Sequence, residues 1–297
     1  MSETVTAKAA PLDKEYLAAF NTVALEDVSS DILARYFRFD EGRLPVSGSD
    51  PLFVANSRNS VIRALCSGYE PELLFLKNTV SNLTVMEMIR AEHPGVPVCI
   101  MDEDELRALW DNADGIAYSF ARYYHAGLFR KKPVPDLSEV LQTAKKVVIF
   151  RVYDAASEDF RDLGPQIRSA VAFFADAVVL GSGIDPYERG LIRSSTGNIF
   201  NVPLAAYDSD AELLRLLRGR GFTSVLISSG DTEGAIPVSE ADCSGRKLAV
   251  IADRSVQTGQ TTDPGLACDL KVYVPGNGVS GIAPCNISIA LYSLLAK

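Results

Sequence analysis

The chain has 297 residues, of which 47% are hydrophobic and 23% charged, and its formal net charge at pH 7 is −9. This length suits two globular domains of roughly 100 to 200 residues each, and no apolar run approaches the roughly 18 residues of a membrane span. The acidic balance argues against a protein that holds nucleic acid by bulk positive charge, because such binding needs a basic face.

Cysteine and histidine usage excludes several kinds of site. The five cysteines are odd in number and lack C-x-x-C spacing, which predicts free thiols and neither a disulfide framework nor a zinc site. His93 and His125 are the only histidines, which disfavours metal sites and histidine-based triads. The N-terminal residues lack the basic and apolar regions of a secretory signal, so we expect a cytoplasmic location.

The first half of the chain alternates helical and extended patterns. A helix is expected over residues 14–37, after a frayed segment of residues 1–12, and Gly68-Tyr69-Glu70-Pro71 separates a later helix from a buried strand. The further predicted elements are strands at 52–55, 73–76 and 96–101, and helices at 60–67, 84–92 and from Asp102 onward. This alternation predicts a small α/β domain over residues 1–139, with a parallel or mixed sheet.

A second α/β domain is expected over residues 140–297. Two prolines mark a candidate linker at 131–136, because proline disfavours helix and stiffens the backbone. The nearly continuous apolar run at 146–152 predicts a strand buried on both faces. The remaining predicted elements are strands at 177–180, 199–202, 223–227, 247–251 and 270–274, and helices at 165–174, 187–195, 210–220 and 286–295. The pattern predicts an open parallel sheet whose ligand crevice lies at the carboxyl ends of its strands.

The turn Gly181-Ser182-Gly183 has two interpretations. A glycine-rich turn after a strand can approach a nucleotide phosphate. However, the third glycine of G-x-G-x-x-G is missing, and the first strand of the domain would normally carry that motif. A plain loop is therefore the favoured interpretation.

Separated segments of the second domain together match one enzyme family. Asp162-Leu163-Gly164-Pro165-Gln166-Ile167-Arg168 precedes a buried strand, and Arg193-Ser194-Ser195-Thr196-Gly197 follows it. Nearer the C-terminus, Ala252-Asp253-Arg254-Ser255 and Gly259 follow another buried strand, and Asn286-Ile287-Ser288 begins the last helix. In this order the segments resemble the sequence blocks of the SpoU (TrmH-type) RNA ribose 2′-O-methyltransferases of the SPOUT superfamily.

The first domain resembles the substrate-binding domain that precedes the catalytic domain in many of these proteins. Phe53-Val54-Ala55-Asn56-Ser57 stands where members carry Phe-x-x-Glu-Gly, and the turn at 68–71 matches a later Gly-Tyr-x-Pro turn. Because the Glu-Gly pair is absent, no contact made by that pair is carried over. The resemblance implies an RNA substrate-binding-like domain over residues 1–139 and a SpoU-type methyltransferase domain over residues 140–297.

The resemblance also implies a fold and an activity. The expected fold is a C-terminal α/β domain with a parallel sheet and a deep trefoil knot, which is an exception to the rule against knotted chains. The expected reaction moves a methyl group from S-adenosylmethionine to a ribose 2′-hydroxyl of ribosomal or transfer RNA. The expected partners are RNA and a second copy of the chain, without a metal or a membrane.

Candidate site residues follow from the resemblance, position by position. Arg168 matches the catalytic arginine, which we expect to bind phosphate and stabilise the developing alkoxide, because a guanidinium is very hard to deprotonate. The structural alternative is an ion pair of Arg168 with Asp162 or Asp159. The other candidates are Asp162 and Asn286 for catalysis, Arg193 with Arg168 for RNA, and Ser228, Ser229, Ala252, Gly259, Val274 and Cys285 for a cofactor bound largely through backbone groups.

Departures from the family pattern leave a second function open. Asp162 replaces Asn, Arg254 replaces Glu, Pro284 replaces Ser, and Ala252 replaces a glycine, where a Cβ can intrude or forbid a positive φ. The first two changes compensate each other only if their loops meet. The alternative to the methyltransferase is a catalytically impaired homologue that acts as an RNA-binding or interaction protein. A generic nucleotide-binding enzyme ranks last, because no phosphate motif supports it.

Overall fold

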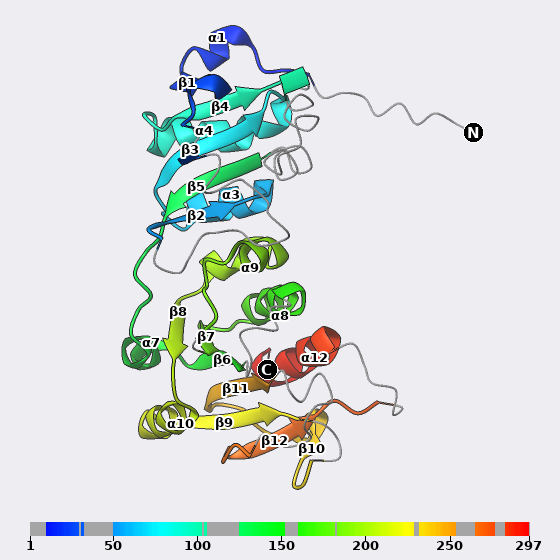
Figure 1. The fold of residues 1–297 in the computed structure, drawn as a ribbon. Coiled ribbons are helices and arrows are strands. Elements are labelled where there is room, and N and C mark those ends of the chain that lie inside the picture. The colour runs from blue at the N-terminus through cyan, green and yellow to red at the C-terminus, as the bar shows by residue number, and fades with distance from the viewer. Residues whose placement is uncertain are drawn as a thin grey trace, which may run out of the picture. The chain divides into compact units, whose positions relative to one another are not determined.

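The structure is a computed structural model, and it divides into two compact units, Met1–Lys132 and Pro133–Lys297 (Figure 1). The division falls after Lys132, within the proline-containing segment 131–136. The structure describes residues 10–29, 31–32, 50–102, 104–105, 125–151, 160–181, 183–228, 232–253, 265–276 and 283–296.

The N-terminal unit is built on a mixed sheet with strand order β1-β4-β3-β5-β2. Strands β1, β4 and β3 run parallel, whereas β5 is antiparallel to both β3 and β2. The strands are β1 (Thr22–Val23), β2 (Leu52–Ala55), β3 (Pro71–Lys77), β4 (Val98–Met101) and β5 (His125–Arg130). The helices are α1 (Lys14–Leu17), α3 (Arg58–Cys66) and α4 (Leu83–Glu92), with 3₁₀ turns η1 (Leu25–Asp27) and η2 (Val80–Asn82). The predicted small α/β domain with a mixed sheet is thereby confirmed.

The long helix predicted over residues 14–37 is wrong. Helix α1 ends at Leu17, and Thr22 and Val23 pair instead with β4, so tertiary strand pairing overrides local helical tendency. Strand β5 was not predicted, because it contains Gly127 and glycine inside a sequence pattern argues against a strand. A Cβ on Gly127 would lie 2.5 Å from the Phe129 ring and 2.7 Å from Leu74, so packing demands the glycine. The helix predicted from Asp102 onward lies almost entirely outside the described residues.

The C-terminal unit contains a parallel sheet with strand order β10-β12-β9-β11-β6-β7-β8. Its strands are β6 (Lys146–Arg151), β7 (Ala177–Gly181), β8 (Leu204–Tyr207), β9 (Phe222–Ile227), β10 (Ile236–Pro237), β11 (Lys247–Asp253) and β12 (Leu270–Tyr273). Its helices are α7 (Leu137–Thr143), α8 (Phe160–Ala172), α9 (Arg189–Ser194), α10 (Asp210–Gly219) and α12 (Ala283–Leu295), with η3 (Asn198–Asn201) and η4 (Val238–Glu240). Strands β6, β7 and β8 follow one another toward one edge of the sheet, and β9 to β12 then lie on the other side of β6. This is the parallel sheet that the sequence predicted.

Alternation along β6 and β11 divides the core between the two faces of this sheet. Val147 and Ile149 share one buried cluster with residues of α7 and α10. Val148 and Phe150 point to the opposite face, because successive side chains in a strand alternate. Helix α12 packs against β11 and α8, and α8 also packs against α9. The helices that carry most of the candidate site residues therefore form one connected group.

Two boundaries in the C-terminal unit differ from prediction. The strand predicted at 199–202 is the 3₁₀ turn η3, and strand β8 begins only after Pro203, because Thr196 and Gly197 turn the chain with φ angles of 52° and 76°. Helix α7 was not predicted, although Asp136 gives a clear start signal, because its carboxylate accepts a hydrogen bond from the Ser138 N–H at 2.7 Å. Within the described ranges, no helix is long and apolar enough to cross a membrane.

Candidate functional site

Three of the expected cofactor residues lie at the carboxyl ends of neighbouring strands. Ser228 follows β9, Ala252 is the next-to-last residue of β11, and Val274 follows β12, and these strands are adjacent in the order β12-β9-β11. The Ser228 N–H donates to the Val272 carbonyl at 2.7 Å, so pairing extends one residue beyond β9. Within the described part of the chain, the backbone of Val274 forms no hydrogen bond. Its N–H and carbonyl are thus free of the sheet.

Ala252 does not have the strain expected for an alanine in place of glycine. It lies within β11, paired in register with Ile227 and Phe150, and it is not among the residues with positive φ. Its side chain is buried. An ordinary strand conformation therefore accommodates alanine at this position.

The last helix supplies the remaining described candidates near the C-terminus. Helix α12 begins at Ala283, so Cys285 and Asn286 lie in its first turn, where backbone N–H groups have no partner within the helix. Pro284 also lies in this turn, and its missing N–H costs the helix no hydrogen bond. Asn286 and Ser288 both lie inside the helix, so neither of them is its N-cap residue. Ser229, Gly259 and Arg254 lie outside the described residues.

Ser288 instead joins the two central helices of the candidate site. Its Oγ lies 2.7 Å from the Oγ of Ser169 on α8, within hydrogen-bond distance. The Ser169 hydroxyl also donates to the Pro165 carbonyl at 3.1 Å. The third sequence block therefore contacts the helix that begins in the first block.

Asp162, Arg168 and Arg193 are exposed on α8 and α9. Among the described residues, Arg168 makes no ion pair, so the alternative of an Arg168–Asp162 pair is not observed; Asp159 lies outside the described residues. Asp162 lies in the first turn of α8, where a carboxylate interacts favourably with the helix dipole. Because α8 packs on α9, the two exposed arginines come from neighbouring helices.

The glycine of the first block has a packing role. A Cβ on Gly164 would lie 2.1 Å from the Ser194 Oγ and 2.4 Å from the backbone of Ser194 and Ser195. Such contacts with backbone atoms cannot be relieved by a rotamer change. Gly164 therefore lets α8 approach the end of α9, which brings the two parts of the block together.

The Arg-x-Ser-x-Gly segment terminates α9. Ser195 is fully buried and donates its hydroxyl proton to the Ile192 carbonyl at 3.0 Å. Gly197 has a left-handed φ of 76° and donates its N–H to the same carbonyl at 2.8 Å, which is the geometry of a helix C-cap. In this segment, the serine and glycine thus shape the backbone, and Arg193 is the residue that faces solvent.

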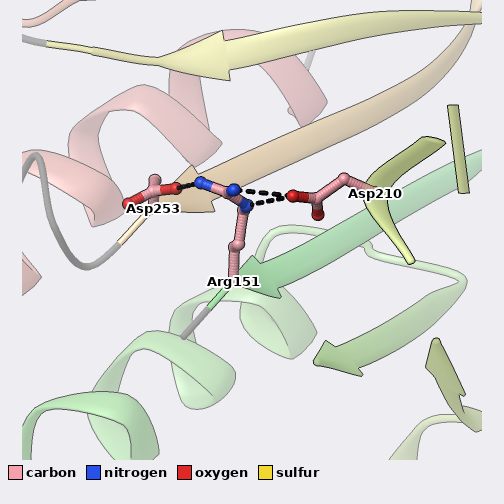
Figure 2. Close-up of polar contacts among 3 residues, drawn as sticks. All are labelled: Arg151, Asp210 and Asp253. Carbon is pink, nitrogen blue, oxygen red and sulfur yellow. Dashed lines mark hydrogen bonds and ion pairs between the residues drawn. The ribbon is translucent and has the colours of Figure 1, made fainter. Parts of the chain in front are cut away.

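Sequence reasoning missed a buried charge cluster at the carboxyl edge of the same sheet (Figure 2). Arg151 ends β6, Asp253 ends β11, and Asp210 begins α10. The guanidinium donates from Nη1 to Asp253 Oδ2 at 2.5 Å, and from Nε and Nη2 to Asp210 Oδ2 at 2.9 and 2.6 Å. The signal was present in the sequence, because a charged residue at the end of an apolar strand must find a partner when the strand is buried.

Burial and charge shift two pKa values in this cluster. Burial alone lowers the pKa of Arg151, but its hydrogen bonds to Asp210 and Asp253 outweigh burial and raise the pKa overall. Burial, followed by the carboxylate of Asp210, raises the pKa of the Tyr207 phenol at the end of β8. At neutral pH the cluster therefore holds a guanidinium cation and a neutral phenol.

Comparison with known proteins connects these features to one group. No protein-family model matches the chain. An uncharacterized tRNA/rRNA methyltransferase of Archaeoglobus fulgidus is 29% identical over 141 residues, covering 46% of this chain and 59% of the relative. The 23S rRNA (uridine(2479)-2′-O)-methyltransferase of Streptomyces viridochromogenes is 28% identical over 134 residues, covering 44% and 46%. The chain thus spans about half the length of these two curated relatives. The 23S rRNA (guanosine(2553)-2′-O)-methyltransferase RlmP of Bacillus subtilis is 27% identical, covering 66% of this chain and 78% of the relative.

Solved structures show the same fold over nearly the whole chain. An rRNA methyltransferase from Sinorhizobium meliloti superposes with a TM-score of 0.65 at 17% identity, covering 93% of this chain and 97% of that one. The SpoU methyltransferase AviRb from Streptomyces viridochromogenes, in complex with the cofactor AdoMet, gives 0.60 at 18% identity, covering 82% and 90%. The fold is that of the SpoU methyltransferases.

The chain is therefore similar in sequence to proteins named as tRNA/rRNA and 23S rRNA methyltransferases, and it has the fold of the SpoU methyltransferases.

Proposed function

We propose that the chain transfers a methyl group from S-adenosylmethionine to a ribose 2′-hydroxyl of ribosomal or transfer RNA. The observation that carries the proposal is the SpoU fold with Ser228, Ala252 and Val274 at three adjacent strand ends. Carboxyl ends of parallel strands are where α/β sheets bind ligands. Homology to named rRNA 2′-O-methyltransferases supports the same reaction.

The proposed cofactor site relies on backbone groups. Val274 offers an N–H and a carbonyl outside the sheet pairing, and Cys285 offers an N–H in the first turn of α12. Ser228, Ser229, Ala252 and Gly259 complete the set that the resemblance suggests. The backbone groups of Val274 and Cys285 fit an adenosine, which needs hydrogen-bonding partners and no charge. When bound, the cofactor supplies an electrophilic methyl group.

In this proposal, Arg168 and Arg193 bind the RNA backbone, and Arg168 also stabilises the developing alkoxide. Both side chains are exposed, and their helices pack together, so one RNA strand can reach both. A guanidinium suits phosphate because its donors match phosphate geometry. Asp162 and Asn286 are the other proposed catalytic residues. Holding the hydroxyl in line with the methyl group lowers the barrier by proximity.

The N-terminal domain, assigned to residues 1–139, is proposed to bind the RNA substrate, and we place the reaction in the cytoplasm. Arg58, which is exposed at the start of α3, supports a binding role, because arginine side chains commonly contact RNA phosphate. Its guanidinium also donates to the Thr84 hydroxyl at 3.2 Å.

We further propose a homodimer that pairs through α12, and a trefoil knot in the C-terminal domain. Ile289 and Tyr292 are 48% and 60% exposed, and they lie one turn apart on the same face of α12. Phe174, two residues after α8, is 67% exposed. An exposed apolar patch of this kind marks an association surface. Light scattering tests the dimer: Tyr292→Lys should yield monomers, and a monomeric wild-type chain would contradict the proposal.

Methyl transfer from labelled S-adenosylmethionine to rRNA and tRNA tests the reaction, with calorimetry for cofactor binding. Arg168→Ala should abolish incorporation while leaving cofactor affinity and folding unchanged. Arg215→Ala is the matched control, because Arg215 is also an exposed helical arginine but lies on α10. Absence of both incorporation and cofactor binding in the wild type would refute the proposal. RNA binding without incorporation would favour the catalytically impaired homologue.

A further inference from the structure

We propose that Arg151 is a positioning residue for the cofactor site, because it clamps the last rung of β6 and β11 to the start of α10. This inference rests on the proposed function and adds a residue that none of the matched sequence blocks contains. Arg151 has no need to touch cofactor or RNA in this role. It acts through the strand ends that hold Ala252 and Asp253.

The geometry of the clamp is specific to a guanidinium. Nη1 is directed to Asp253, whereas Nε and Nη2 both donate to one oxygen of Asp210 (Figure 2). One planar group therefore fixes two carboxylates on different elements at once. A lysine ammonium carries the same charge but cannot present this fork.

Because the charged groups of the clamp are largely buried, they must stay paired with one another. The Arg151 side chain is 8% exposed, that of Asp253 is wholly buried, and that of Asp210 is 32% exposed. A buried charge is tolerated only when it is paired and hydrogen-bonded, so the three groups have few alternative arrangements. The neutral Tyr207 phenol closes the cluster from the end of β8, where its pKa shift reports the proximity of Asp210. The charged and titratable groups in this cluster are therefore Arg151, Asp210, Asp253 and Tyr207.

The clamp lies on the strand pair directly next to the proposed cofactor residue Ala252. Asp253 is paired in register with Arg151, and the preceding rung pairs Ala252 with Phe150. On the other side of β11, Ala252 pairs with Ile227, the residue before Ser228. Displacement of the Asp253 end therefore moves Ala252 relative to Ser228. A cofactor recognised by backbone groups is sensitive to such a shift, because hydrogen bonds weaken steeply with misalignment.

An ordinary structural ion pair is the competing explanation, and the opposite edge of the sheet offers a control. Asp269 precedes β12 and accepts hydrogen bonds from the Ser224 N–H at 2.8 Å and the Ser224 hydroxyl at 2.7 Å. Asp269→Asn weakens an internal carboxylate contact just before β12, with Ser224, which is in register with Ala249 and therefore three residues before the rung of Ala252. If the clamp only contributes stability, its substitution and Asp269→Asn should therefore change cofactor affinity to the same extent.

The experiment compares Asp253→Asn, Arg151→Lys, Asp210→Asn and the control Asp269→Asn in the full chain. Calorimetry at a temperature where all variants are folded should show a Kd for S-adenosylmethionine raised by about tenfold or more in Asp253→Asn and Arg151→Lys. Asp210→Asn should have a smaller effect, because a carboxylate that is 32% exposed is replaced while the buried pair of Arg151 and Asp253 remains. The control should bind like the wild type. Hydrogen exchange without cofactor should be faster in peptides 146–151 and 247–253 of the first two variants only.

The outcomes separate this inference from the proposed function. If the wild type binds S-adenosylmethionine and both Asp253→Asn and Arg151→Lys retain its affinity, the positioning role is refuted and the function stands. Equal losses in these variants and in Asp269→Asn would also refute it. A wild type that binds no cofactor refutes the function itself, and the positioning role with it. If Asp253→Asn does not fold, Arg151→Lys decides the question, because it keeps the charge balance of the cluster.

Discussion

The C-terminal unit contains arginines in two contrasting settings. Arg168 and Arg193 lie exposed on α8 and α9, within the segments that resemble the family blocks. Arg151 lies buried at a strand end, outside those segments, with its donors directed to two carboxylates. Arg168, which makes no ion pair among the described residues, can donate to an external phosphate, whereas the donors of Arg151 are directed to two carboxylates of the chain itself. Substitution should therefore change activity with little loss of stability in the first setting, and lower stability as well as cofactor affinity in the second.

The largest expected effect on stability comes from Asp253→Ala. Removing the fully buried carboxylate leaves Arg151 without one of its two partners, and breaking a buried ion pair costs about 3–5 kcal/mol of unfolding free energy. Urea denaturation measures this loss. Replacing both partners, as in Arg151→Met with Asp253→Leu, should recover part of it, because the carboxylate that loses the guanidinium, Asp210, is 32% exposed and is not fully buried. A double variant as unstable as the single one would contradict this account of the pair.

A buried histidine in the N-terminal unit should make stability depend on pH. Burial, followed by the charge of Arg58, lowers the pKa of His125 to about 4. Between pH 6.5 and 4 the unfolded chain binds a proton that the folded chain does not, so stability falls as the pH falls, by roughly 3 kcal/mol across that window. Denaturation at several pH values measures the slope. His125→Gln should remove this component, and an unchanged slope in that variant would show that other groups cause it.

The packing of α8 on α9, which brings the exposed arginines onto neighbouring helices, is tested by Gly164→Ala. The added Cβ would meet backbone atoms at 2.4 Å, so the helices must separate at a cost of about 1–3 kcal/mol. Gly219→Ala is the matched control in α10, because nothing lies within 4 Å of its Cβ position. The control should stabilise the chain by about 0.5–1 kcal/mol, as expected for glycine in a helix. Similar melting temperatures for both variants would argue against the close approach.

The smallest effect on stability is expected for Arg168→Ala. An exposed side chain without an ion pair among the described residues should contribute within about 0.5 kcal/mol to unfolding free energy. Thermal unfolding checks this value beside the methyl-transfer assay. A large loss of stability would place Arg168 with Arg151, as a structural residue, and would remove the contrast between the two settings.

Periodicity predicted the C-terminal unit well and the start of the chain poorly. Strands such as β6 and β11 are long apolar runs that stay buried on both faces, so their signal survives without tertiary information. Strand β1 has two residues and exists only because β4 offers it a partner. The boundary error at β8 came from a backbone turn at Thr196 and Gly197, whose φ angles local hydrophobicity does not encode.

The candidate site was predictable only in part, for a similar physical reason. The family resemblance identified residues by position, and the structure brings Ser228, Ala252 and Val274 to adjacent strand ends. The clamp could not be recognised from spacing, because its three members are far apart in the chain and join only when β6, β11 and α10 are assembled. The packing demand at Gly164 likewise depends on α9, a different element.

The contact between Lys146 and the end of α12 has a consequence for how the C-terminal unit folds. The Lys146 ammonium, at the beginning of the first strand of the unit, donates to the Leu295 carbonyl near the end of the chain. Ser169 and Ser288 likewise join segments 119 residues apart. Contacts between such distant segments require large loops to close before they contribute, which slows folding. Because these contacts need α12, the unit cannot be completed on the ribosome until that helix has been synthesised.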